Sequence, residues 1–283
     1  MNILGINVSN SGSICLLKDG QVDFYLEAER ITRKKFDCVV KDLVEYVNVV
    51  DVIAVVDAHW VASEKNMLTA RDIAKFKRVF PDAKFIDYRK SHHLAHAAGG
   101  FYSSGFDEAA CIIVDSNGSS VGDTVEIETI IHAKKSNRFH WKLMHKKCWG
   151  LGENGIGKLF EGISKFCGFD YEDAGKVMGL AAYGSKKVDL YNTGGSSKED
   201  AAYTIQTLWE ERALELAQLA LKKTKCKNLV LSGGCFLNCV VNYKLRKQLP
   251  EDVRIYVDPI AHDGGTAIGA AYLAYYNPKT KNS

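Results

Sequence analysis

Residues 1–28 read MNILGINVSNSGSICLLKDGQVDFYLEA, and this stretch decides the fold. Residues 2–7 and 14–18 are apolar runs of strand length, and a polar turn, Ser9-Asn10-Ser11-Gly12-Ser13, separates them. The dipeptide Asp19-Gly20 is a hairpin signal, and residues 21–28 have the alternation of a third strand. The sequence therefore predicts three consecutive antiparallel strands joined by two short turns.

The same pattern begins again after residue 108. Residues 108–114 predict a strand, residues 115–120 a polar turn, and residues 124–133 and 139–145 two further strands. A duplication of this kind builds two similar lobes with a cleft between them. Three antiparallel strands with a polar turn after the first are typical of the opening of an actin-like ATPase domain. We therefore expect an α/β protein with a duplicated actin/hexokinase-like fold, mixed sheets and an interlobe cleft.

The repeat also suggests where the two lobes lie in the chain. We expect an N-terminal lobe at residues 1–108 and a C-terminal lobe at residues 109–283, with the last helix packing back on the first lobe. Residues 41–50 and 266–275 read as helices, the second of them rich in alanine and glycine.

Composition restricts the class of protein. Hydrophobic residues make up 46% and charged residues 25%, which is usual for a globular protein, and a net charge of +3 is too small to indicate nucleic acid. None of the eight cysteines forms a CxxC pair, so we expect reduced, mostly buried thiols rather than a disulfide framework. Neither a signal peptide nor an apolar run of membrane-spanning length is evident. We therefore expect a cytoplasmic protein with no membrane partner.

Residues 91–97 read SHHLAHA and contain two histidines four positions apart. On a helix, His92 and His96 lie on one face, about one turn apart. Asp115, at the end of a predicted strand, and Asp263, before a glycine-rich turn, offer carboxylates. Two imidazoles with carboxylates suit Fe, Zn or Mn. The alternative is a helix N-terminus whose histidines cap and pack, with Asp263 as a helix cap.

Several glycine- and serine-rich turns are candidates for binding a nucleotide. The turn at residues 9–13 offers backbone N–H groups and hydroxyls, and the turn at residues 115–120 is its counterpart in the second lobe. Gly233-Gly234 follows an apolar strand, and Gly264-Gly265 opens a helix whose N-terminus favours anions. Each of these turns is also explained by a plain strand connection.

A basic cluster from Arg30 to Lys35 follows the third strand. Arginine grips phosphate through two hydrogen bonds, so Arg30 is a candidate phosphate ligand. A solvated start of a surface helix is the alternative.

Together these elements resemble the O-carbamoyltransferase family of nodulation-factor and antibiotic biosynthesis. The matching segments are ILGINVSNSGSICLLKDG, EAERITRKKFD, SHHLAHAAGGFYSSGF, AGKVMGLAAYG, LSGGCFLNCVVNYKL and DGGTAIGAAYLA, in the family's order. The N-terminal domain of this family is similar to the tRNA threonylcarbamoyl-transfer proteins, which have an actin/hexokinase-like fold.

The resemblance implies roles for particular residues. His92, His96, Asp115 and Asp263 would ligate Fe(II) or another divalent transition metal, with Mg²⁺ as a further possibility, and would form the catalytic centre. The residues implied at the site of ATP or carbamoyl-adenylate are Ser9, Asn10, Ser11, Gly12, Ser13, Gly118, the stretch 152–157 that ends in Gly157, Lys176, Gly179, Gly233, Gly234 and Asn238.

The chain also departs from the family's pattern. Ser11 and Gly12 stand where members usually carry His-Asp, Phe36 stands at a usual histidine, and Ala174 stands at a usual acidic residue. Family members continue into a second, adenylate-forming domain, which we expect to be absent here. Either a separate protein supplies the activated carbamoyl group, or the chain uses another donor, or it has lost activity.

The leading hypothesis is a metal-dependent O-carbamoyltransferase that moves the carbamoyl group of carbamoyl-adenylate, made from carbamoyl phosphate and ATP, to a hydroxyl of a small-molecule acceptor. His93 and His262 are the candidate bases nearest in sequence, with packing roles as the alternative. A tRNA threonylcarbamoyl transferase and a non-catalytic nucleotide-binding subunit are the two rival hypotheses. Nucleic acid is not an expected partner in the leading hypothesis.

Overall fold

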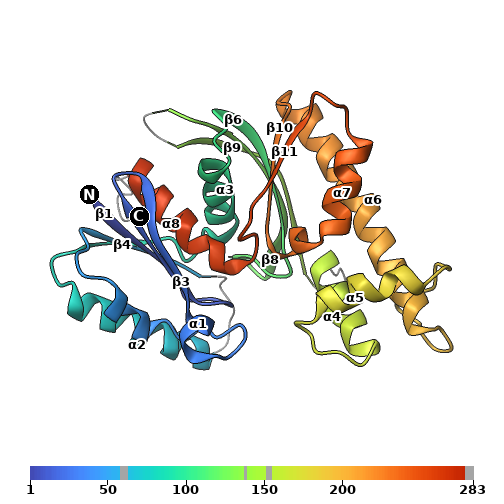
Figure 1. Cartoon of the computed structure of the whole chain (residues 1–283), viewed down its shortest axis with the longest axis horizontal. Helices are drawn as coiled ribbons and strands as arrows, with labels where there is room; N and C mark the ends of the chain where they lie inside the picture. Colours follow the sequence, from blue (N-terminus) through green and yellow to red (C-terminus); the bar gives the residue numbers. More distant parts are fainter. Residues whose placement is uncertain (58–62, 137–138, 151–154, 278–283) are drawn as a thin grey trace.

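The computed structural model describes residues 1–57, 63–136, 139–150 and 155–277. They form two mixed β-sheets with helices between the sheets and on their outer faces (Figure 1). No helix in these ranges combines the length and the apolar character needed to cross a bilayer.

The first sheet has five strands in the order β3-β2-β1-β4-β5. Its strands are β1 (Asn2–Asn7), β2 (Ser13–Lys18), β3 (Gln21–Glu27), β4 (Val52–Val56) and β5 (Lys84–Asp87). The first three are antiparallel, whereas β4 and β5 run parallel to β1. Asn7 lies opposite Ser13, so residues 8–12 form the turn at the carboxyl end of β1.

The second sheet repeats this topology. Its strands are β6 (Glu108–Val114), β7 (Ser120–Val121), β8 (Thr124–Lys134), β9 (His140–Trp149), β10 (Asn228–Ser232) and β11 (Arg254–Val257). Strands β6, β8 and β9 are antiparallel neighbours, whereas β10 and β11 run parallel to β6. The duplication predicted from residues 1–28 and 108–145 is therefore present in the fold.

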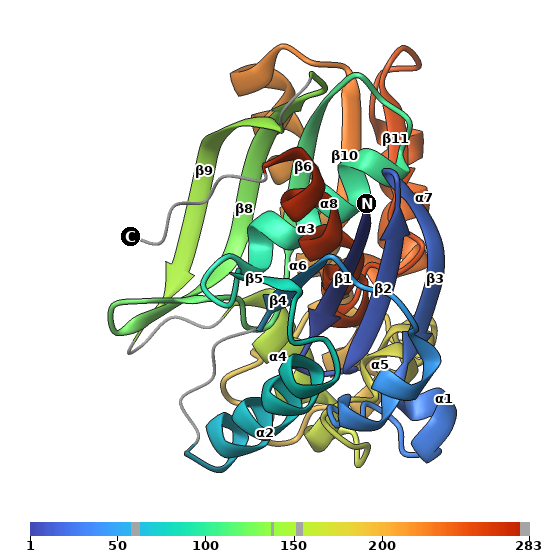
Figure 2. The ribbon, with the colours of Figure 1, turned by 90° about the vertical axis from the view of Figure 1, so that its left-hand side faces the viewer.

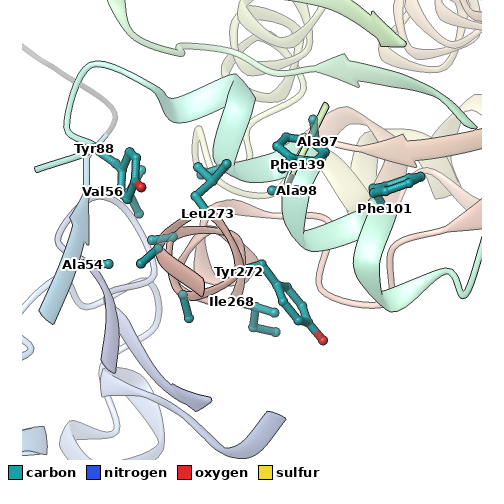
Figure 3. Close-up of a cluster of buried hydrophobic side chains, with 14 of the residues drawn as sticks. Ala54, Val56, Tyr88, Ala97, Ala98, Phe101, Phe139, Ile268, Tyr272 and Leu273 are labelled. Atoms are coloured by element: carbon teal, nitrogen blue, oxygen red, sulfur yellow. The ribbon is translucent and has the colours of Figure 1, made fainter. Parts of the chain in front are cut away.

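Two helices lie next to each other between the sheets (Figures 1 and 2). Helix α3 (His92–Ser103) packs on β6, β8 and β10, whereas α8 (Thr266–Tyr276) packs on β1, β2 and β4. Helix α8 is apolar on all sides, as expected of a helix that is buried all round. Figure 3 shows Ile268, Tyr272 and Leu273 of α8 in one buried cluster with Ala54 of β4 and Ala97 of α3.

Glycines allow this close packing. A Cβ at Gly5 of β1 would lie 1.9 Å from the carbonyl oxygen of Ala267, and one at Gly269 would lie 1.8 Å from that of Ala95. Neither position has room for any side chain. The backbones of α3, α8 and β1 are therefore held in direct contact.

The outer faces of both sheets are covered by further helices. The first sheet is covered by α2 (Ser63–Val79) and a short 3-10 helix at Lys41–Tyr46, and α1 (Ala28–Thr32) follows β3. The sequence predicts a helix over residues 41–50, but only this 3-10 helix forms there. The prediction of a longer helix is therefore wrong. Beside the second sheet lie α6 (Lys198–Thr224), which packs on β6, β8 and β9, and α7 (Cys239–Gln248), whereas α4 (Ile156–Phe166) and α5 (Ala174–Leu180) pack on α6. Trp209 of α6 is fully buried in this layer.

Candidate functional site

Four side chains from three parts of the chain meet at the base of the interlobe cleft. His92 and His96 come from the first two turns of α3, Asp115 follows β6, and Asp263 opens the short 3-10 helix before α8. Their four candidate ligand atoms all lie within 4.8 Å of one another. The helix places the two histidines on one face, and the strand end brings Asp115 to them, as the sequence predicts.

The spacing within this cluster suits one metal ion. The two Nε2 atoms are 3.1 Å apart, and the four Nε2–carboxylate distances range from 3.4 Å to 3.8 Å. Ligand atoms that share a metal at about 2.1 Å lie roughly 3–3.5 Å from each other. Both imidazoles are fully buried, and the two carboxylates are 10% and 13% exposed. The donor set of nitrogen and carboxylate oxygen fits a divalent transition metal.

Charge in the cluster also favours a cation. Burial lowers the pKa of His92, but the carboxylates of Asp263 and Asp115 raise it to about 10. Burial raises the pKa of Asp263, yet His92 and His96 hold it well below its usual range. Two carboxylates this close together need compensating positive charge, which either protons on the histidines or a metal ion supplies.

A hydrogen-bonded relay fixes the orientation of His96. Ser232 Oγ, at the end of β10, donates to Asp258 Oδ2 over 3.0 Å, and His96 Nδ1 lies 3.2 Å from Ser232 Oγ. Because the only hydroxyl proton of Ser232 points to Asp258, His96 Nδ1 must be the donor. This arrangement leaves the lone pair on His96 Nε2, which faces the cluster. Such outer partners are typical of metal-binding histidines.

The other candidate ligands differ in the hydrogen bonds that orient them. Ser9 Oγ donates to Asp263 Oδ2 over 3.1 Å, and the backbone N–H of His92 donates to Ser119 Oγ over 3.0 Å. His92 Nδ1 is buried and has no hydrogen-bond partner among the described residues. The turns that follow β1 and β6 therefore both position the cluster, one from each lobe.

The cluster opens into a cleft of about 590 Å³. The residues that line it are Asn10, Ser11, Phe36, Asp115, Ser116, Asn117, Gly157, Lys158, Phe160, Glu161, Tyr171, Glu172, Ala174, Gly175, Met178, Trp209, Gly234, Cys235, Leu237, Asn238, His262 and Asp263. Residues 10, 11 and 36 belong to the first lobe, and most of the others belong to the second. The cleft is large enough for a nucleotide-sized ligand.

Some of the residues predicted for nucleotide binding line this cleft. They are Asn10, Ser11, Gly157, Gly234 and Asn238. Ser9 and Ser13 are buried beside it, and Ser13 Oγ donates to the carbonyl oxygen of Gly264 over 2.7 Å. Residues 152–154 of the predicted stretch lie outside the described residues.

Three other residues that were predicted to bind phosphate or nucleotide do not line the cleft. Arg30 pairs with Glu29 at 3.5 Å, and Lys176 pairs with Asp173 at 2.7 Å; both side chains are largely exposed and do not line the cleft. Gly179 also does not line it.

Three of the predicted glycines allow close packing instead. A Cβ at Gly12 would lie 2.8 Å from the backbone of Cys38, and one at Gly233 would lie 2.3 Å from the carbonyl oxygen of Val114. A Cβ at Gly118 would lie 2.7 Å from the ring of His93. These three positions leave no room for a side chain and do not line the cleft, and their contact with a nucleotide stays a prediction.

The two candidate bases are also placed differently. His93 is fully buried, its Nδ1 lies 2.7 Å from Thr129 Oγ1, and burial together with nearby His92 lowers its pKa well below the usual value. His262 lines the cleft, and its Nε2 lies 3.3 Å from Glu27 Oε1. Of the two, only His262 is within reach of a ligand in the cleft.

Several residues of the site were not singled out in the sequence. Ser232 and Asp258 form the relay to His96, and Glu27, which accepts a hydrogen bond from Tyr25 at 2.7 Å, contacts His262. Asp258 follows β11 just as Asp115 follows β6, so the pattern of a carboxylate after a strand was an available signal. Glu27 is the last residue of β3, so it too is a carboxylate at a strand end.

Curated proteins with related sequences include a nodulation protein and a tRNA-modifying enzyme. The nodulation protein NolNO of Sinorhizobium fredii is 26% identical over 225 residues, which cover 65% of this chain and 30% of that protein. The tRNA N6-adenosine threonylcarbamoyltransferase of Nanoarchaeum equitans is 28% identical over 144 residues, which cover 43% of this chain and 45% of that protein. The match thus spans about a third of the nodulation protein and under half of the tRNA-modifying enzyme.

Solved structures share the fold. A ROK family glucokinase from Streptomyces griseus, solved in complex with glucose and AMPPNP, aligns with a TM-score of 0.52 at 14% identity, covering 96% of this chain and 99% of that one. The fold is therefore actin/hexokinase-like, as the repeated strand pattern predicts.

The sequence model of the carbamoyltransferase N-terminus matches residues 68–203 and 186–272, which together include most of the chain. The matched part contains all four residues of the histidine–aspartate cluster and most residues that line the cleft. The chain belongs to the carbamoyltransferase N-terminus family.

Proposed function

We propose that the chain is a metal-dependent O-carbamoyltransferase. The observation that carries the proposal is the cluster of His92, His96, Asp115 and Asp263 at the base of a nucleotide-sized cleft. Family membership and the nodulation relative support carbamoyl transfer as the reaction class. The glucokinase neighbour, which holds AMPPNP, supports a nucleotide in the cleft.

The proposed donor is carbamoyl-adenylate, supplied by an adenylate-forming protein or domain. The acceptor hydroxyl oxygen forms a bond to the carbamoyl carbon, and the bond from that carbon to the phosphate oxygen breaks. The hydroxyl proton is released, and AMP leaves with the electron pair of the broken bond. A bound divalent cation would supply positive charge for the oxygen atoms that carry negative charge during transfer.

The chain's own residues would hold the reactants. Asp115 and Asp263 contribute their carboxylates to the cation site, and the relay through Ser232 keeps His96 Nε2 aimed at the same point. The N-terminus of α4, where Gly157 lines the cleft, favours an anionic group such as the donor's phosphate. Lobes that enclose the donor would limit its loss to water.

Mass spectrometry tests the reaction. The chain is incubated with Fe²⁺, ATP, carbamoyl phosphate and an adenylate-forming domain of a relative, together with hexoses, aminoglycosides or hydroxymethyl nucleosides. We expect one acceptor class to gain the mass of a single carbamoyl group with the wild type but not with Asp263→Asn. A parallel reaction with threonylcarbamoyl-adenylate as donor and tRNA as acceptor tests the rival threonylcarbamoyl hypothesis.

One result of this experiment would contradict the proposed function. If ATP and metal bind and the added domain makes carbamoyl-adenylate, but no class of hydroxyl is modified, carbamoyl transfer by this chain is contradicted. That result would favour the non-catalytic nucleotide-binding subunit.

A further inference from the structure

Two aromatic rings from opposite lobes line the cleft, and the proposed transfer step gives neither of them a role. Phe36 lies in the loop after α1 in the first lobe, and Tyr171 lies in the connection between α4 and α5 in the second. An ion pair of 3.5 Å between Lys35 Nζ and Asp173 Oδ1 joins these two segments. The two rings therefore stand on neighbouring walls of one part of the cleft.

The first turn of α5, beside these rings, presents almost no side chain to the cleft. Ala174, Gly175 and Met178 all line the cleft, and a Cβ at Gly175 would have no atom within 4 Å. Ala174 and Gly175 carry almost no side chain, so the first turn of the helix leaves open space. We call the part of the cleft lined by Phe36, Tyr171, Ala174, Gly175 and Met178 the ring slot.

The backbone of Phe36 is held in an uncommon conformation. Its φ is +58°, a left-handed value that is rare for a bulky side chain, and its N–H donates to Glu29 Oε2 over 3.1 Å. Such strain persists where the surroundings enforce it, and it occurs most often at functional sites.

A lysine covers one face of each ring in the slot. Lys35 Nζ lies 4.6 Å from the centroid of Phe36, and Lys165 Nζ lies 4.4 Å from the centroid of Tyr171. The structure contains no ring contact between Phe36 and Tyr171 themselves, both of which lie in the described ranges. The remaining face of each ring is the one on which a ligand can stack.

We propose that the ring slot binds a flat aromatic or heteroaromatic ring of the acceptor, and this inference rests on the proposed function. The substrate class is an alcohol whose hydroxyl is attached close to such a ring. Aromatic walls and a bare helix surface favour a planar group through stacking. Gly234 opens the short 3-10 helix after β10 and Asn238 caps α7; both are predicted for the nucleotide, and neither is part of the slot.

Saturation-transfer difference NMR tests the slot with two probes. Benzyl alcohol carries its hydroxymethyl group on a flat ring, whereas cyclohexylmethanol carries the same group on a puckered ring. Each probe is titrated into the wild type, Phe36→Leu and Tyr171→Leu, and ATP is titrated separately. Phe85→Leu is the matched control, because Phe85 is half-buried, has Lys77 Nζ 3.9 Å from its ring centroid, and does not line the cleft.

We expect benzyl alcohol to bind the wild type and the control equally. The Kd should rise about 2- to 10-fold in Phe36→Leu and in Tyr171→Leu, as expected for loss of one aromatic contact. Cyclohexylmethanol should bind more weakly and should not distinguish the variants, and the adenine signals of ATP should be unchanged. Circular dichroism confirms that each variant is folded.

Two results would overturn the inference. Unchanged binding of benzyl alcohol in both slot variants excludes a ring site there, and loss of adenine signals alone assigns the slot to the donor nucleotide. The measurement needs no turnover. Ring binding without carbamoyl transfer would therefore contradict the proposed function and the acceptor's role, and would leave only a binding site for a flat ring.

Discussion

Ser232 is the residue on which the orientation of His96 depends. Its hydroxyl accepts from His96 Nδ1 and donates to Asp258, so it transmits the position of a buried carboxylate to a ligand of the cluster. We predict that Ser232→Ala weakens the affinity for a divalent transition metal about 10-fold, the lower end of the usual effect of losing an outer partner. Competition with a coloured chelator measures this affinity.

Ser164→Ala is the control for this prediction. Ser164 is also fully buried, but its Oγ has no hydrogen-bond partner among the described residues, so the loss of its hydroxyl leaves no group unpaired. Equal metal affinities of the two variants would show that the relay does not position His96.

At the residue level, the side chains that could be predicted from the sequence are those that a single helix or strand places. The four-residue spacing of His92 and His96 becomes proximity because the segment is helical, and Asp115 is placed by the end of its strand. Arg30 and Lys176 are different, because their exposed side chains pair with Glu29 and Asp173 and do not line the cleft. Such competition between partners cannot be read from spacing alone.

Helices α3 and α8 are in direct backbone contact. A Cβ at Gly269 would lie 1.8 Å from the carbonyl oxygen of Ala95. We predict that Gly269→Ala lowers the free energy of unfolding by about 3 kcal/mol or more, because the two helices must separate to admit one methyl group. Urea unfolding measures the change.

A second glycine on a helix provides the comparison. A Cβ at Gly162 of α4 would have no atom within 4 Å, so Gly162→Ala should raise the free energy of unfolding by up to about 1 kcal/mol. Similar effects of the two substitutions would contradict the close helix contact.

The elements themselves were largely predictable, whereas their contacts across the molecule were not. The apolar runs at residues 2–7 and 14–18 and the Asp19-Gly20 turn predict the first three strands, because hairpin signals are local. The segment at residues 41–50 gives only a 3-10 helix, since packing against the first sheet overrides its helical pattern. Packing of α8 on the first sheet joins residues more than 200 positions apart.

At the scale of the whole molecule, we expect metal binding to stabilise the folded state. The cluster draws ligands from both lobes and from α3 between the sheets, so an ion bound there stabilises the folded state over the unfolded chain. Occupancy at 100 times Kd adds about 2.7 kcal/mol. We predict that a chelator lowers the Tm of the metal-loaded protein by roughly 5–10 °C.

Differential scanning calorimetry measures this shift. The chelator should leave the Tm of His96→Ala unchanged, since that variant has lost one ligand of the cluster. An equal decrease in both proteins would mean that the chelator acts elsewhere.

The duplicated two-lobe architecture was the part of the whole molecule that the sequence predicted, because each half carries its own strand–turn–strand signal. The ring slot was not predicted. Phe36 and Tyr171 lie 135 positions apart, and only the ion pair between Lys35 and Asp173 shows that their segments meet.

Metal content by elemental analysis tests the central claim most directly. Wild type, His96→Ala and Asp263→Asn are purified after incubation with Fe²⁺, and His132→Ala is the control because His132 pairs with Glu108 on the second sheet, away from the cluster. We predict about one transition-metal ion per chain in the wild type and the control, and loss of that ion in both cluster variants. A wild type that binds no metal, or cluster variants that bind as much as the wild type, would contradict the account.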